Sequence, residues 1–130
     1  MGLEERRKIK EYQDTIIPER TKELEEIVGG TIPYDIDWET FANDSEALRF
    51  LDNLSCHRIN MAMRTICIDD MGKEAVRDGV KVIKLKNVQS KDEMSLAVEG
   101  GALSMALNYA KGTDGYYSDN EIRTALMAKL

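Results

Sequence analysis

The chain has 130 residues, of which 42% are hydrophobic and 32% are charged, and its formal net charge is -6. A chain of this length can bury the core of one domain, and it is too apolar for an intrinsically disordered protein. Its acidic balance disfavours a surface for nucleic acid or anionic membrane, because such surfaces need a local excess of lysine and arginine. We therefore expect a single folded domain over residues 1–130.

The sequence also favours a cytoplasmic location. It contains no apolar run long enough to cross a bilayer, and its first residues lack the apolar segment of a signal peptide. Its two cysteines do not suggest a disulfide framework, and if Cys56 and Cys67 share one helix they are too far apart to be bridged. We expect both as free thiols.

The N-terminal segment from Leu3 to Val28 has the apolar spacing of a charged amphipathic helix. Pro18 lacks a backbone N–H and crowds the preceding turn, so we expect a kink or a break there, with a second helical piece beginning at this proline. A Gly-Gly pair after Val28 is suited to the left-handed cap that ends a helix. Residues 31–38 then alternate apolar and polar side chains, which predicts a strand, and Pro33 favours an edge position or a bulge.

The segment from Asn43 to Asp78 is predicted to be the central helix of the domain. Asn43 and Glu46 match a capping box, although Asp44 or Ser45 would also serve as the cap. Apolar side chains cover most of its circumference, so it should be surrounded on most sides. The remaining polar stripe is narrow and consists of Glu46, Asn53, Asn60 and Arg64. We expect Gly72 to interrupt this helix.

Three strands and a last helix are predicted after the central helix. Residues 80–88 are rich in β-branched side chains, but an irregular alternation indicates either a bulge or a central strand buried on both faces. Two alternating runs within residues 94–109 are separated by Gly-Gly, which predicts a β-hairpin. Ser118 and Glu121 form a second capping box, which predicts the start of a C-terminal helix.

The predicted order of elements is α-β-α-β-β-β-α, which indicates an α+β fold. We expect a two-layer sandwich with a mainly antiparallel four-stranded sheet. The long central helix would lie on the apolar face of the sheet, and the N- and C-terminal helices would close over the outer side of that helix.

The second face of the predicted sheet carries unusually small side chains. A simple exposed face usually carries longer polar side chains, whereas small ones permit close approach of another layer. That layer would be a helix of the same chain, a second copy or another protein. The small residues are Ser95, Ala97, Ala102, Ser104 and Ala106.

Four residues are candidates for ligand binding. Arg58 projects into the apolar arc of the central helix with Thr65 beside it, so either a carboxylate of the chain or an anionic ligand must pair with it. His57 at the edge of that arc and Tyr109 at the end of the last predicted strand are candidates for proton transfer. No spacing of His, Cys, Asp or Glu matches a metal site, and no motif indicates a cofactor or assigns a catalytic residue.

The sequence favours a protein-binding or adaptor module without catalysis, with a protein partner or a second copy on the small-residue face. The first alternative is a small-molecule-binding protein or an enzyme, with a pocket between the sheet and the central helix around Arg58 and His57. The second alternative is an immunity or antitoxin-type inhibitor whose acidic surface blocks a basic site on its target.

Overall fold

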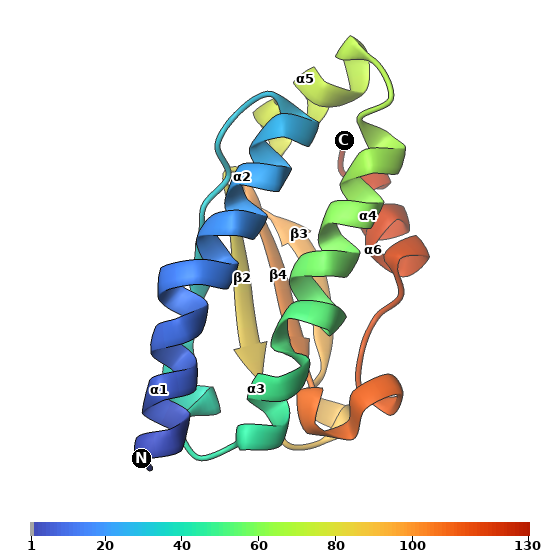
Figure 1. The fold of residues 1–130 in the computed structure, drawn as a ribbon. Coiled ribbons are helices and arrows are strands. Elements are labelled where there is room, and N and C mark those ends of the chain that lie inside the picture. Colours follow the sequence, from blue (N-terminus) through green and yellow to red (C-terminus); the bar gives the residue numbers. More distant parts are fainter. Residues whose placement is uncertain (1) are drawn as a thin grey trace.

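The computed structural model of the chain describes residues 2–130. It has two layers, a four-stranded sheet and a set of helices on one face of that sheet (Figure 1). The predicted α+β class is confirmed, with one more helix than expected, because two helices rather than one lie between the first two strands. Of the helices in the described residues, none combines the length and the hydrophobicity needed to cross a membrane.

The N-terminal helix changes its winding ahead of Pro18. It consists of α1 (Leu3–Glu11), a π-helical turn (Tyr12–Ile16) and α2 (Ile17–Val28), with Pro18 in the first turn of α2. The wider π-helical turn accommodates the proline ring and its missing N–H while the chain continues along one helical path (Figure 1). Gly29 then ends α2 with a φ of 82°, which is the predicted left-handed cap.

The central helix also contains a π-helical turn. It consists of α3 (Ser45–Leu51), the turn (Asp52–Cys56) and α4 (His57–Ile66). Of the three residues that were candidates for its cap, Asp44 is the one in that role: its Oδ1 accepts a hydrogen bond of 3.0 Å from the backbone N of Ala47.

The predicted segment 43–78 is divided into two helices. The chain leaves the helical conformation at Cys67, and α5 (Asp70–Gly79) begins after Asp69, whose Oδ1 accepts a hydrogen bond of 2.8 Å from the N of Gly72. The break therefore precedes Gly72. A Cβ at Gly72 would lie 2.0 Å from the carbonyl oxygen of Ile66, so only glycine allows α5 to turn this closely against the end of α4.

The sheet is mixed, so the prediction of a mainly antiparallel sheet is wrong. Its strands are β1 (Tyr34–Ile36), β2 (Val82–Asn87), β3 (Ser95–Glu99) and β4 (Ala102–Leu107), in the order β1-β2-β4-β3. β1 pairs with β2 in parallel, β2 pairs with β4 in parallel, and only β3 and β4 are antiparallel. The helices between β1 and β2 act as the long crossover that a parallel pair requires, and the second strand of the hairpin, not the first, lies beside β2.

The β3–β4 hairpin agrees with the prediction. Gly100 and Gly101 have φ values of 59° and 80°, as a tight two-residue hairpin loop requires. β4 is the more buried strand and occupies a central position, whereas β3 has exposed residues at both ends, Ser95 and Glu99, and forms the edge.

The first two strands are regular but differ from the prediction in extent. β1 covers only the middle of residues 31–38, because Trp38–Phe41 form a short 3-10 turn. In β2, Ile83 and Leu85 are buried, and Val82 is half-buried on the opposite face. Neither proposed explanation holds, because β2 pairs without a bulge through this point and its second face carries the exposed Lys84 and Lys86 beside Val82.

The helices form a layer with the central helix in its middle. α4 packs against α2 on one side and against α6 (Asp119–Met127) on the other, and α6 also contacts β3 (Figure 1). The first and last helices were expected to close over the outer side of the central helix. They lie beside it instead. The capping box at the start of α6 is confirmed, since Ser118 and Glu121 exchange hydrogen bonds of 3.1 and 3.2 Å.

A network of charged and polar side chains joins α2 to the central helix. Arg20 makes two hydrogen bonds to the carboxylate of Asp52, of 2.8 and 2.9 Å, and one of 3.1 Å to Glu23. Glu23 accepts a further hydrogen bond of 2.6 Å from Asn60, and Arg64 lies 3.5 Å from it. Asn60, predicted as part of the polar stripe, is fully buried in this network. The seam between the two helices is therefore polar and specific in its geometry.

Replacing Asp52 with Asn should destabilise the domain by about 1–2 kcal/mol, because the amide keeps the shape but removes the charge that Arg20 contacts through two hydrogen bonds. Urea unfolding measures the difference. Asp14→Asn is the matched control, since Asp14 pairs with Lys10 on the exposed side of the helix and should contribute less than about 0.5 kcal/mol. Equal effects of the two substitutions would show that the Arg20 contact does not stabilise the helix pair.

Candidate functional site

The two faces of the sheet differ in what covers them. Alternate side chains of a strand point to opposite faces. Ile83 and Leu85 of β2 and Leu103 and Met105 of β4 point towards the helices and are buried. We call the opposite side the open face. It is formed by Asp35, Val82, Lys84, Lys86, Ala102, Ser104, Ala106, Ser95, Ala97 and Glu99.

No helix within residues 2–130 lies on the open face. Lys84, Lys86 and Ser95 are exposed, and Ser104 at the centre of the face is only half-buried. A shallow hollow of about 670 Å³ lies over this face, with Trp38 near the end of β1 on its border. Of the three occupants that the small side chains allow, a helix of the same chain is therefore absent from the described residues.

The register gives the open face an ordered pattern of charge and size. Asp35, Lys84, Ser104 and Ala97 lie side by side across the four strands. The next row begins with Lys86 and continues with two more small residues, Ala106 and Ser95. Two lysines thus form a line along β2, and a trough of small side chains runs beside them over β4 and β3.

Neither Lys84 nor Lys86 forms an ion pair with another described residue, although six such pairs occur elsewhere in the domain. Their ammonium groups are therefore available to carboxylates from outside. In the trough, Ser and Ala side chains allow another backbone to come close to the sheet. This combination suits contact with a protein segment that carries acidic side chains along one side.

Arg58 is not paired with a carboxylate among the described residues. Its guanidinium lies over the ring of Tyr116, 4.4 Å from the ring centroid, in a cation–π contact, and its buried Nε has no hydrogen-bond partner. Of the two partners expected for Arg58, a carboxylate of the chain or an anionic ligand, the first is absent there. Arg58 does not line the hollow over the open face or any of four further surface cavities, which lie against other residues.

The other three predicted ligand-binding residues do not converge on Arg58. His57 is half-buried on α4. Thr65 is exposed and donates a hydrogen bond of 3.3 Å to the carbonyl of Met61, about 10 Å further along the helix axis than Arg58. Tyr109 is fully buried, with its ring 5.2 Å from that of Phe41. None of the hydrogen bonds, ion pairs or ring contacts of these four residues joins one of them to another.

A buried cluster of hydroxyls and a thiol was not predicted from the sequence. The π-helical turn of the central helix places Ser55 and Cys56 in the core, close to the hydroxyls of Tyr34 and Tyr109. Both tyrosine hydroxyls lack a hydrogen-bond partner of good geometry among the described residues. A nearby tyrosine, Tyr12, donates a hydrogen bond to the carbonyl of Leu48. The only signal in the sequence was that Tyr34 and Tyr109 fall on the apolar side of their strand patterns.

Burial disfavours the ionised forms of the thiol and the tyrosine hydroxyls in this cluster. Burial, and to a smaller extent the charge of Asp52, together raise the pKa of the Cys56 thiol to about 12. Burial also raises the pKa of Tyr34 and of Tyr109. Because the thiolate and not the thiol is the nucleophile, Cys56 lacks the character of a catalytic cysteine at neutral pH. No group of three or more His, Cys, Asp or Glu within residues 2–130 is arranged to hold a metal ion.

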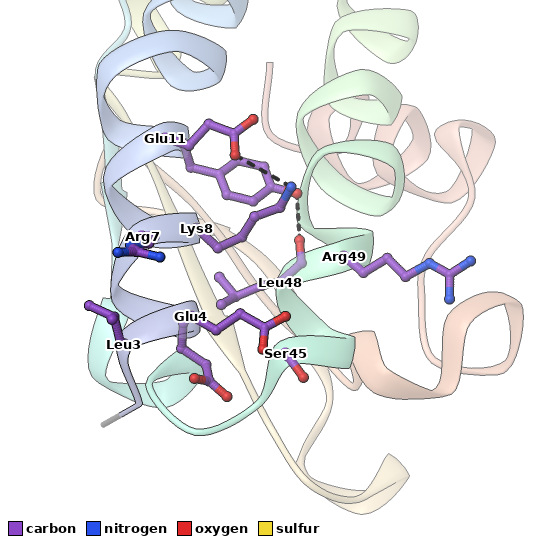
Figure 2. Close-up of a pocket in the computed structure, with 10 residues that line it drawn as sticks. Leu3, Glu4, Arg7, Lys8, Glu11, Ser45, Leu48 and Arg49 are labelled. Atoms are coloured by element: carbon purple, nitrogen blue, oxygen red, sulfur yellow. Dashed lines mark hydrogen bonds and ion pairs between the residues drawn. The ribbon is translucent and has the colours of Figure 1, made fainter.

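A crevice of about 720 Å³ lies between α1 and α3 (Figure 2). Its charges are mixed: Lys8 forms an ion pair of 3.5 Å with Glu11, and Arg49 points away from α1. Tyr12 and Leu48 also line the crevice, and the hydroxyl of Tyr12 donates a hydrogen bond to the carbonyl of Leu48. Because the charges of the crevice do not converge on one point, we do not assign it a ligand.

Comparisons with known proteins do not add to this description. No protein-family model matches the chain, and no curated protein or solved structure shows significant similarity to it.

Because Tyr12 and Cys56 are harder to ionise in the folded state, we expect the domain to lose stability at alkaline pH. The folded state holds the pKa of Tyr12 and Cys56 at about 12, whereas the ordinary values are 10.0 and 9.0. The stabilisation is therefore complete below about pH 9 and declines as the pH rises towards 12. Urea unfolding in reducing buffer at several alkaline pH values measures this decline.

Two phenylalanine variants test the origin of that decline. Tyr109→Phe should be neutral or stabilising at pH 7, because it removes an unpartnered buried hydroxyl, and it should make the decline shallower. Tyr12→Phe should instead cost about 1 kcal/mol at pH 7, since it removes the hydrogen bond to Leu48. A Tyr109→Phe variant that is much less stable at pH 7 would mean that this hydroxyl is hydrogen-bonded.

Proposed function

We propose that this chain is a protein-binding module and that the open face is its binding surface. The observation that carries the proposal is the absence of any helix on that face within residues 2–130, together with the small size of the side chains on it. A sheet packed on one side only usually shows longer polar side chains on the other. Here the central strand β4 instead presents Ala102, Ser104 and Ala106.

The partner that fits this face is a protein segment with carboxylates along one edge. Its backbone would lie over the trough of small residues, and its acidic side chains would meet Lys84 and Lys86. Since the two lysines have no ion pair in the described chain, the partner does not need to displace an internal contact. The positive line is local, because the chain as a whole has a net charge of -6.

A small-molecule site around Arg58 and His57 has weaker support. The unpartnered Nε of Arg58 favours such a site. A small-molecule site also needs a pocket at Arg58, and the cavities of the structure lie against other residues. An inhibitor that acts through an acidic surface is supported only by the net charge of -6.

In the first step, a photo-crosslinking amino acid replaces Ser104 in the chain expressed in cells of the natural source. A second variant carries it in place of Glu74 on α5 and serves as the control. A protein that crosslinks only at position 104 is then purified, and its Kd for the wild-type chain is measured. Ser104→Arg fills the trough with a long charged side chain and should weaken binding by roughly 10-fold or more.

The charge requirement is tested with Lys84→Glu and Lys86→Glu. These should weaken binding and reduce its dependence on salt, whereas Lys22→Glu, an exposed lysine on α2 in the helix layer, should change neither. The proposal is wrong if every captured protein binds Ser104→Arg as tightly as the wild type, or if no protein crosslinks at position 104 in preference to the control position.

A further inference from the structure

A second surface feature lies far from the open face, at the end of the domain opposite the N-terminus. There the break between α4 and α5 and the C-terminal end of α6 come together (Figure 1). Ile68 and Met71 are each 80% exposed and Met127 is 58% exposed, which makes them the most exposed large apolar side chains described. They surround a groove of about 660 Å³ between α5 and α6. We call this the apical groove.

The exposure of these side chains is a consequence of the backbone. Asp69 caps α5 with its Oδ1 on the N of Gly72, and the close approach of Gly72 to Ile66 fixes the turn. This geometry places Ile68 and Met71 on the surface, so the rest of the domain does not cover their side chains. Contiguous exposed apolar side chains of this size are uncommon on a protein that functions as a monomer.

The two rims of the apical groove carry opposite charges. On the α5 side Asp70 is exposed next to Met71, and on the α6 side Arg123 lines the groove one turn before Met127. Neither of these charges forms an ion pair with another described residue. Within the described residues, the side chain of Arg123 donates a hydrogen bond to the neutral side chain of Asn120.

This arrangement is complementary to itself. A two-fold axis through the apical groove would bring the α5 rim of one copy against the α6 rim of the other, and the same contacts would occur twice. We propose that the chain forms a symmetric dimer in this way, with Asp70 of each copy pairing with Arg123 of the other. Ile68, Met71 and Met127 would form the apolar centre, where the flexible methionine side chains can adapt to one another.

The dimer leaves the open face free, because the apical groove is formed by the helices on the other side of the sheet. One assembly would then present two partner-binding faces. The dimer does not depend on the protein-binding role proposed for the open face, and the two proposals can fail separately.

Sedimentation equilibrium over concentrations from about 1 µM to about 1 mM tests the dimer. The wild-type chain should associate to a dimer and no further. Ile68→Arg should raise the dimer Kd by roughly 30-fold or more. Two control variants should leave the Kd unchanged: Leu3→Arg, at an exposed leucine on α1, and Ser104→Arg on the open face. A chain that is monomeric at every concentration, or a dimer that Ser104→Arg disrupts and Ile68→Arg does not, overturns the proposal.

A charge swap tests the contact itself. Arg123→Asp and Asp70→Arg should each weaken the homodimer, because each places like charges opposite one another twice. An equimolar mixture of the two variants should dimerise again, since both contacts in the mixed dimer join opposite charges. Misfolding of either variant would not produce this recovery, and circular dichroism checks the fold directly. A mixture that stays as monomeric as its components contradicts the predicted pairing.

Discussion

The seam between α2 and the central helix holds the helical layer together, and the Arg20–Asp52 contact is at its centre. Its two hydrogen bonds of 2.8 and 2.9 Å join the two helices at the π-helical turn of the central one. Hydrogen bonding to Asp52 raises the pKa of Arg20, and hydrogen bonding from Asn60 lowers the pKa of Glu23, so the charged forms of both groups are favoured where they lie. A polar seam of this kind fixes the alignment of the two helices more strictly than hydrophobic packing alone, because each hydrogen bond needs a specific partner. With the helices gathered on one side, the other face of the sheet stays uncovered.

The local elements could be predicted because their signals are local. The alternation of residues 94–109 around Gly-Gly identified the hairpin, and the spacing of Ser118 and Glu121 identified the start of α6. The direction of strand pairing could not be predicted in this way, since a strand alternates identically whether its neighbour is parallel or antiparallel. The π-helical turns were missed for a related reason: one extra residue in a turn shifts the apolar face only gradually. Asn60 was assigned to a narrow polar stripe, and the structure buries it against Glu23.

The sequence predicted the composition of the open face but not what lies on it. Alternation alone placed Ala97, Ser104 and Ala106 on one side of the sheet, and only the three-dimensional arrangement shows that the helices are all on the other side. The apical groove was not predicted, because Ile68 and Met71 fell inside the predicted central helix, ahead of the interruption expected at Gly72. Arg58 illustrates the same limit: its position in the apolar arc was evident, but its contact with the ring of Tyr116 depends on a loop more than 50 residues away.

The central claim is that the sheet presents an uncovered face of small residues to partners. The most direct test is the broadening of alanine methyl signals by a soluble paramagnetic reagent in the purified protein. The structure predicts strong broadening for Ala97 and Ala102 on the open face and little for Ala47 on α3 and Ala62 on α4, which are buried in the core. Because the proposed dimer uses the apical groove, the broadening should also persist at concentrations where the chain is dimeric. Protection of Ala97 and Ala102 equal to that of Ala62 in the monomer would contradict the account.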